Sequence, residues 1–156
     1  MAWSIEAHEY ETGPEIVSQL KELNGIRVVN FVSCAGTGAH LTGITRALRR
    51  AGYIVNVTLV EPTGCDSRAG VFVDHRFEGM AVGVMPPLLD WDLIGGTVRV
   101  DHATMLATQQ HFAAMHGYFV GNTSAACIAV ASNLAACMPA SHKVLTIAYD
   151  HGLWYV

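Results

Sequence analysis

The stretch NFVSCAGTGAHLTGITR, residues 30–46, decides how this chain folds. An apolar run at 26–32 leads into the small-residue turn 34–39, and apolar residues at helical spacing follow that turn. This order predicts a strand, a glycine-rich loop and a helix. Glycine lets a backbone approach a ligand closely, and the free N–H groups at a helix start favour an anion. The loop is therefore a candidate phosphate cradle.

The same loop has two other interpretations. An ordinary strand-to-helix turn also uses glycine, and the loop alone does not exclude it. A dinucleotide-binding GxGxxG loop fails, because the third glycine is missing at the expected step. Ser33 and Cys34 end the strand, where ligands meet α/β sheets, but no histidine or aspartate is placed beside them by spacing. Neither is therefore predicted to be a nucleophile.

The size and composition indicate about one domain with much buried surface. We treat residues 1–156 as a single unit. Charged residues make up only 14%, against a usual share of about 25%. So little charge predicts extensive burial, including at a subunit interface. The formal net charge is -4, and no basic cluster occurs beyond Arg46, Arg49 and Arg50, so nucleic acid is not an expected partner.

Targeting signals and cysteine usage point to the cytosol. No apolar run approaches the ~20 residues of a membrane span, and the acidic N-terminus has no apolar signal-peptide core. We therefore expect a cytoplasmic protein with no membrane partner. Cys34, Cys65, Cys127 and Cys137 show no CxxC spacing. We expect reduced, mostly buried thiols, with a disulfide pair or a catalytic thiol as alternatives.

The histidines do not predict a metal site, because they show no HxxxH or HExxH spacing. His40 stands at the predicted helix start, where it either donates a hydrogen bond to a phosphate or occupies a partly exposed surface. His151 follows the last predicted strand, where a surface turn is the simpler interpretation.

The first half of the chain predicts two helices and two strands. Thr12 and Glu15 form a capping box for a helix that stops near residues 24–25. A strand at 26–33, a helix at 40–51 and a strand at 54–60 follow. Residues 62–83 have no clear periodicity, and a loop of that length is usually functional or mobile.

The second half continues the alternation. A strand at 97–100 leads into a helix that Asp101 caps and that ends at residues 116–117. Residues 121–124 open a small-residue helix at 125–137, where Thr123 and Ser124 would serve as helix caps, and a strand at 143–148 comes last. Alternating strands and helices with continuous apolar strands predict an α/β three-layer sandwich with a partial parallel sheet of about four strands.

Six segments, in this order along the chain, resemble the C-terminal half of the cysteine synthase and cystathionine β-synthase family. These are fold type II pyridoxal-phosphate enzymes, built like the tryptophan synthase β subunit. The segments are 9–15 (EYETGPE, like TTGPEI), 36–43 (GTGAHLTG, like GTGGTLTG), 60–62 (VEP), 77–83 (FEGMAVG, like IQGIGAG), 121–126 (GNTSAA, like GISSGA) and 149–155 (YDHGLWY, like DSGxRYL). The resemblance implies part of the large domain of that fold.

The resemblance also implies a cofactor site. Gly36, Thr37, Gly38, Ala39 and His40 would surround the phosphate of pyridoxal phosphate, and Gly79 would lie near cofactor and substrate. Thr123 would face the pyridine nitrogen, where the family places a serine or threonine hydroxyl. Such a hydroxyl leaves the ring nitrogen unprotonated, which suits β-elimination and β-replacement on amino acids.

The chain also departs from the family pattern. The family's Schiff-base lysine and its loop for the substrate carboxylate belong to the N-terminal half, which this sequence does not match. Neither Lys21 nor Lys143 stands at the position of that lysine. Ala39 and His40 replace a glycine and a threonine of the phosphate loop, and Ala39 would either disfavour a positive φ there or simply narrow the cradle. Ala125 replaces the glycine of GISSGA.

Three hypotheses for function follow. The first is the C-terminal subunit of a split pyridoxal-phosphate lyase or transferase of amino-acid metabolism, inactive alone and completed by a lysine-bearing partner chain in a heteromer. The second is a non-catalytic binding or regulatory subunit of the same fold. The third is a repurposed pocket of a specialised biosynthetic pathway, with lysine-free acid–base chemistry by His40 or His151. A partial sheet leaves an open edge and apolar helix faces, so pairing with another chain or with itself is expected.

Overall fold

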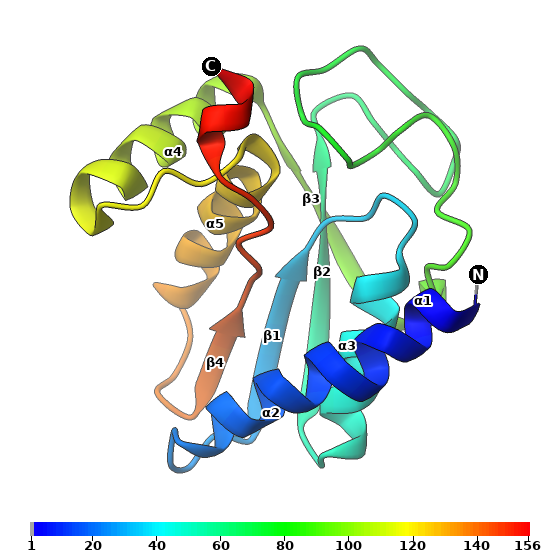
Figure 1. The fold of residues 1–156 in the computed structure, drawn as a ribbon, viewed down its shortest axis with the longest axis vertical. Helices are drawn as coiled ribbons and strands as arrows, with labels where there is room; N and C mark the ends of the chain where they lie inside the picture. The colour runs from blue at the N-terminus through cyan, green and yellow to red at the C-terminus, as the bar shows by residue number, and fades with distance from the viewer. Residues whose placement is uncertain (1) are drawn as a thin grey trace.

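The computed structural model describes residues 2–156, in which four parallel strands lie between two layers of helices (Figure 1). The strand order across the sheet is β3-β2-β1-β4. The strands are β1 (Val28–Ser33), β2 (Ile54–Pro62), β3 (Ile94–Val100) and β4 (His142–Leu145). The expected partial parallel sheet of about four strands is confirmed.

The helices cover both faces of this sheet, as the three-layer prediction requires. On one face lie α1 (Ala2–Ala7), α2 (Gly13–Lys21) and α3 (Ala39–Arg50), and on the other lie α4 (His102–His116) and α5 (Asn122–Ala135) (Figure 1). No helix among residues 2–156 combines the length and apolarity needed to cross a bilayer.

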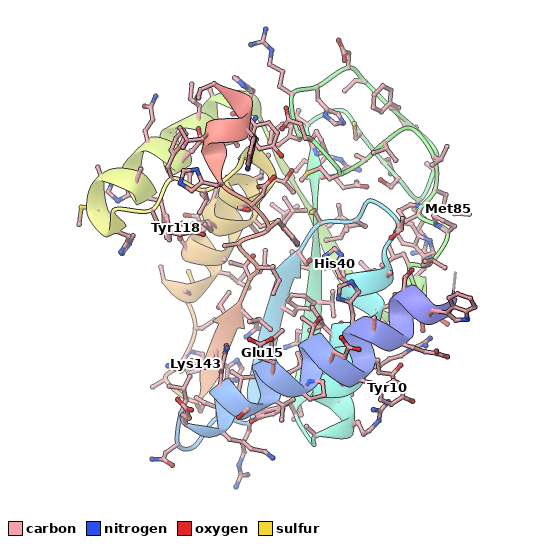
Figure 2. All side chains as sticks on the ribbon, viewed as in Figure 1. Tyr10, Glu15, His40, Met85, Tyr118 and Lys143 are labelled. Atoms are coloured by element: carbon pink, nitrogen blue, oxygen red, sulfur yellow. The ribbon has the colours of Figure 1, made fainter. Side chains whose placement is uncertain are left out.

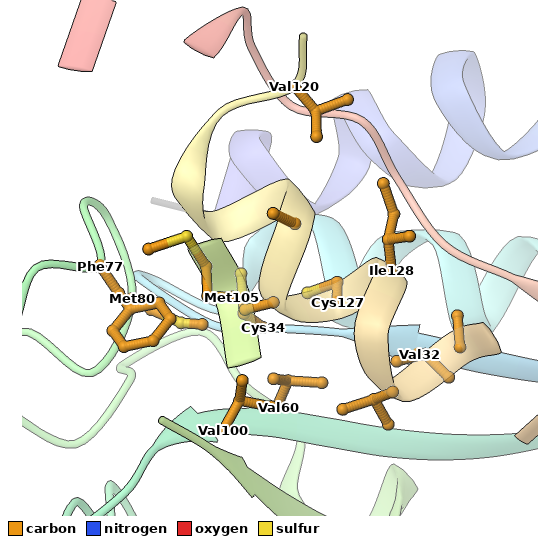
Figure 3. Packing of buried hydrophobic residues seen from close by; sticks show 14 residues of the cluster. Val32, Cys34, Val60, Phe77, Met80, Val100, Met105, Val120, Cys127 and Ile128 are labelled. Carbon is orange, nitrogen blue, oxygen red and sulfur yellow. The ribbon is translucent and has the colours of Figure 1, made fainter. Parts of the chain in front are cut away.

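The central strand β1 supplies both halves of the core through its two-residue side-chain period. Phe31 is fully buried and packs with Leu41 and Ile44 of α3. Val32 is also fully buried, but it packs on the opposite face with Cys127 and other small residues of α5 (Figure 3). The apolar run before the glycine-rich loop is therefore a strand that is buried on both faces.

Parallel pairing fixes where a ligand can meet the sheet. Val28 lies beside both Ile54 and His142, so β1, β2 and β4 begin together. Their carboxyl ends then meet at one edge, which is where α/β sheets bind ligands. Residues 63–90 cross this edge with only a single bridge between Asp66 and Val71, as the lack of periodicity predicted.

The predicted helix start at Thr12 is wrong. Thr12 has helical dihedral angles, and its side chain makes no cap. Its Oγ1 lies 3.1 Å from Nδ1 of His8 instead. A π-helical turn, His8–Thr12, joins α1 to α2, and Gly13 donates its N–H to the carbonyl of His8. The capping box with Glu15 does not form, because the segment before Thr12 is itself helical.

Gly13 has a packing role rather than a capping role. A Cβ placed there would come within 2.2 Å of the Cβ of Ala47. The glycine therefore lets α2 approach α3 closely.

The later helix signals are confirmed in part. Asp101 caps α4 by accepting the N–H of Thr104 at 2.7 Å, and Gly117 ends α4 with φ of 69°. The small-residue helix begins earlier than expected, at Asn122, with Gly121 before it. Strand β3 begins three residues before the predicted start, and β4 ends at Leu145, because the following residues leave β1 to approach the ligand-binding edge.

Candidate functional site

A pocket of about 400 Å³ lies at the carboxyl ends of β1 and β4. Its volume is within the roughly 300–1,000 Å³ that small-molecule sites occupy. It is lined by Cys34, Gly36, Thr37, His40, Glu78, Gly79, Thr123, Tyr149, Asp150 and Tyr155. These residues come from four separate segments of the chain, so the fold rather than local sequence assembles the pocket.

The glycine-rich loop forms one wall of this pocket. Gly38 has φ of 86° and stands directly before α3. A Cβ on Gly36 would come within 2.5 Å of the carbonyl oxygen of Gly79, so these two segments touch backbone to backbone. The first N–H groups of α3 have no partners within the helix, although the N–H of Ala39 donates to the hydroxyl of Thr37 at 3.4 Å. This wall can therefore bind an anion.

The pocket brings together five of the seven predicted cofactor residues: Gly36, Thr37, His40, Gly79 and Thr123. Gly38 and Ala39 lie behind the lining. The expected strain at Ala39 is wrong, because Gly38 carries the positive φ and Ala39 is the first residue of α3. Replacing a glycine by Ala39 therefore does not distort the loop.

His40 lines the pocket and is partly buried, with two hydrogen-bond partners for one ring nitrogen. Its Nε2 lies 2.8 Å from Oγ of Ser33 and 3.1 Å from the hydroxyl of Tyr149. Burial, aided by the neighbouring His8, lowers the pKa of His40 to about 4. His40 is thus neutral at pH 7, and it remains a partly exposed residue of the helix start.

Thr123 lies in the first turn of α5 without capping it. Its hydroxyl donates to the carbonyl of Glu78. The neighbouring Ser124 accepts the N–H of Tyr149 at 2.9 Å. Both hydroxyls therefore tie the start of α5 to other segments around the pocket.

Two acidic residues, Glu78 and Asp150, are among the residues that line the pocket. Asp150 accepts a hydrogen bond from the hydroxyl of Tyr155, which raises the pKa of Tyr155 to about 12. Glu78 accepts from the amide of Asn122 at 3.0 Å. No lysine or arginine is among the residues that line the pocket in the described part of the chain.

Sequence reasoning missed Glu78, Tyr149, Asp150 and Tyr155 as site residues. The signal was present, because Glu78 precedes Gly79 and the other three belong to the terminal segment that resembles DSGxRYL. The position of Tyr149 just beyond the last predicted strand also placed it at the ligand-binding edge.

Both lysines lie at the opposite edge of the sheet. Lys143 is in β4, beside Val29 near the start of β1, and Figure 2 shows it far from His40. Lys21 is the last residue of α2, shortly before β1 begins. The pocket therefore receives no amino group from either side chain.

The other expected features are placed as follows. Nδ1 of His151 accepts the N–H of Leu153 in a turn outside the pocket, consistent with the simpler interpretation. No group of three metal-ligating side chains occurs within residues 2–156. Cys34, Cys65 and Cys127 are buried free thiols, whereas Cys137 is exposed.

Comparison with known proteins identifies the family. Residues 2–150 match the family model described as pyridoxal-phosphate dependent enzyme. O-ureido-L-serine synthase of Streptomyces lavendulae is 32% identical over 150 residues, which is 96% of this chain and 45% of that protein. A probable cysteine synthase of Bacillus subtilis strain 168 is 29% identical over 152 residues, which is 97% of this chain and 49% of that protein.

Solved structures agree. The crystal structure of O-ureido-L-serine synthase matches with a TM-score of 0.88 at 31% identity, over 99% of this chain and 48% of that chain. A hydrogen sulfide-producing enzyme from Fusobacterium nucleatum matches with a TM-score of 0.86 at 27% identity, over 97% of this chain and 45% of that chain.

The fold and the pocket therefore define a fold type II, tryptophan synthase β-like architecture. The chain belongs to the pyridoxal-phosphate dependent enzyme family, in its cysteine synthase-like part. It spans about half the length of the curated relatives it matches.

The residues of the pocket fit pyridoxal phosphate. The start of α3 and the Thr37 hydroxyl offer donors for a phosphate, and Thr123 offers a hydroxyl on another wall. A Cβ on Gly79 would meet nothing within 4 Å, so the pocket stays open beside this glycine. Because His40 is neutral, hydrogen bonds and the helix start would supply the attraction for a phosphate, of which the helix start contributes only ~0.3–2 kcal/mol.

Proposed function

We propose that this chain forms the C-terminal half of an active site that acts on an amino acid by β-elimination or β-replacement with pyridoxal phosphate. A second, lysine-bearing chain would complete the site and supply the loop for the substrate carboxylate. The observation that carries the proposal is the meeting of the glycine-rich loop, Gly79 and Thr123 around one pocket, while both lysines lie at the other edge.

In this proposal the chain positions the cofactor. The N–H groups at the start of α3 and the hydroxyl of Thr37 hold the phosphate, and the hydroxyl of Thr123 meets the pyridine nitrogen. Gly79 leaves room for cofactor and substrate. When bound, pyridoxal phosphate supplies the electron sink for chemistry at the carbon next to the amino group. In the structure the hydroxyl of Thr123 donates its one proton to the carbonyl of Glu78, so in this proposal the hydroxyl turns from that carbonyl to the pyridine nitrogen as the cofactor binds.

Exposed apolar side chains around the pocket support a partner chain. On the 63–90 segment they are Val71, Phe72, Val73, Val82, Val84 and Met85, and at the C-terminus they are Leu153, Trp154 and Val156. Both groups border the edge of the sheet where the strands end (Figures 1 and 2). Apolar surface of this extent on two sides of one pocket is typical of an interface.

Reconstitution of activity tests the proposal. The full chain alone should not turn over cysteine or an O-substituted serine in the presence of pyridoxal phosphate. Adding the lysine-bearing partner should produce turnover, and a partner with that lysine changed to alanine should not. Turnover by this chain alone, or unchanged partner activity without it, would contradict the proposal.

A non-catalytic binding or regulatory subunit is the second candidate. The specific observation in its favour is that Glu78 and Asp150 line a site without a lysine or arginine in the described lining. This candidate predicts a stable complex whose activity does not change with Thr123→Ala. The proposed active site predicts that the same change lowers activity, while Thr123→Ser retains it.

A further inference from the structure

Two buried thiols, Cys34 and Cys127, share one hydrophobic cluster, and neither has a role in the proposed function. Cys34 directly follows β1 and lines the pocket, although its residue surface is only 3% exposed. Cys127 lies on α5 and is fully buried. Both belong to the same buried cluster, and Figure 3 shows their sulfur atoms within it. One thiol therefore borders the pocket and the other stands behind it.

The surroundings make the two thiols unequal. Hydrogen bonds from Cys127 and Tyr149 lower the pKa of Cys34, although burial opposes this. The hydrogen bond with Cys34, together with burial, raises the pKa of Cys127 well above its ordinary value. Cys34 lines the pocket and Cys127 does not, so Cys34 is the thiol that a small molecule in the pocket reaches first, and a lowered pKa favours its nucleophilic thiolate form.

We propose that Cys34 is a modification site for small hydroperoxides that enter through the pocket, and that Cys127 resolves the oxidised product as an internal disulfide. In the first step the Cys34 sulfur attacks one peroxide oxygen. An S–O bond forms, the O–O bond breaks, and the alcohol or water leaves with the proton. Cys34 is oxidised to a sulfenic acid and the peroxide is reduced.

In the second step the sulfur of Cys127 attacks the sulfur of Cys34. The S–S bond forms, the S–O bond breaks, and water leaves with the Cys127 proton. The disulfide would join the carboxyl end of β1 to α5 beside the pocket. A low-molecular-weight thiol would restore both cysteines by exchange. The proposal does not depend on cofactor binding or on a partner chain.

The full chain treated with hydrogen peroxide tests this pair. Exposed Cys137 is first changed to serine, so that it does not react. Tryptic digestion without reductant then separates Cys34 (28–46), Cys127 (100–143) and Cys65 (51–68) into different peptides. The expected result is a cross-linked 28–46 and 100–143 pair, with Cys65 unmodified. Cys65 is the matched control because it is equally buried but lies away from the pocket.

A second variant separates the two steps. With Cys127→Ser in the same background, the proposal predicts a sulfenic acid on Cys34 that a 1,3-diketone traps. With Cys34→Ser, Cys127 should stay reduced. Cross-links that involve Cys65, an unmodified Cys34 after peroxide, or oxidation of Cys127 without Cys34 would each overturn the proposal. If a second substitution prevents folding, the cross-linked peptides of the Cys137→Ser chain still show whether Cys34 and Cys127 form a disulfide.

Discussion

The Oγ atom of Ser33 and the Nε2 atom of His40 lie 2.8 Å apart and join the last residue of β1 to the first turn of α3. The hydroxyl of Tyr149 lies 2.7 Å from the same Oγ atom. These three side chains connect the glycine-rich loop to the C-terminal segment, so two walls of the pocket are held together from within the protein.

Burial of His40 among these side chains predicts that the free energy of unfolding depends on pH. The pKa of His40 is about 4 in the folded chain, below its ordinary value of 6.5. The folded state therefore favours neutral His40, and that contribution is fully present above pH 6.5 and lost as pH falls toward 4. The loss is up to ~3 kcal/mol. Denaturant unfolding of the chain and of His40→Gln at pH 7 and pH 4 measures it.

His40→Gln is the comparison because glutamine can still place a polar nitrogen near Ser33 but does not titrate. The free energy of unfolding of the variant should fall less between pH 7 and pH 4 than that of the unchanged chain. Equal losses in both proteins would show that His40 is not held neutral.

Gly36→Ala should disturb the pocket. The added Cβ would come within 2.5 Å of the carbonyl oxygen of Gly79, and backbone must shift to admit it. Such overpacking costs about 1–3 kcal/mol in the free energy of unfolding, and affinity for pyridoxal phosphate should fall as well. Gly96→Ala is the matched control, since a Cβ there meets nothing within 4 Å. Similar unfolding curves for both variants would contradict the close contact.

Thr123→Ala should weaken the link between α5 and the segment at Glu78. The hydroxyl of Thr123 donates to the backbone carbonyl of Glu78. Losing one hydrogen bond lowers the free energy of unfolding by about 1 kcal/mol. Thr123→Ser keeps the hydroxyl and should retain stability and cofactor affinity. Denaturant unfolding and equilibrium dialysis with pyridoxal phosphate measure the two effects. A serine variant as impaired as the alanine variant would assign the effect to the methyl group instead.

Trp154→Ser should weaken association with the lysine-bearing partner by about tenfold or more, because interface tryptophans often contribute over 1 kcal/mol. Trp154 is 80% exposed beside the pocket, so the change should leave the fold intact. Trp3→Ser is the matched control, because Trp3 is 81% exposed but lies on α1. Titration calorimetry gives both affinities. Equal affinities of the two variants for the partner would show that the C-terminal segment is not part of the interface.

The fold could be predicted from the sequence because its signals are local. The apolar run before the glycine-rich loop, the cap at Asp101 and the end at Gly117 each depend on residues near in sequence, and all three appear in the structure. The start at Thr12 could not be read correctly, because Thr12 and Pro14 are typical of a helix start. The π-helical turn that carries the helix through them leaves no simple pattern.

The candidate site also has one part that local sequence predicts and another that depends on contacts between distant residues. The glycine-rich loop is recognisable from its composition, so the sequence alone predicts Gly36 and Thr37 as residues of the site. The hydrogen bond of His40 with Tyr149 joins residues that are 109 positions apart. The proximity of Cys34 to Cys127 depends on how α5 packs on β1. Spacing in the sequence carries no information about such contacts, and only the fold reveals them.

The visible absorption of pyridoxal phosphate in the reconstituted complex tests the central claim most directly. A candidate lysine-bearing chain is purified together with this chain, and cofactor is added. The account predicts a stable complex with a visible absorption band that disappears when the partner's lysine is changed to alanine and weakens with Gly36→Ala. A stable complex that shows no such band with added cofactor, or a band that the partner gives equally without this chain, would contradict it.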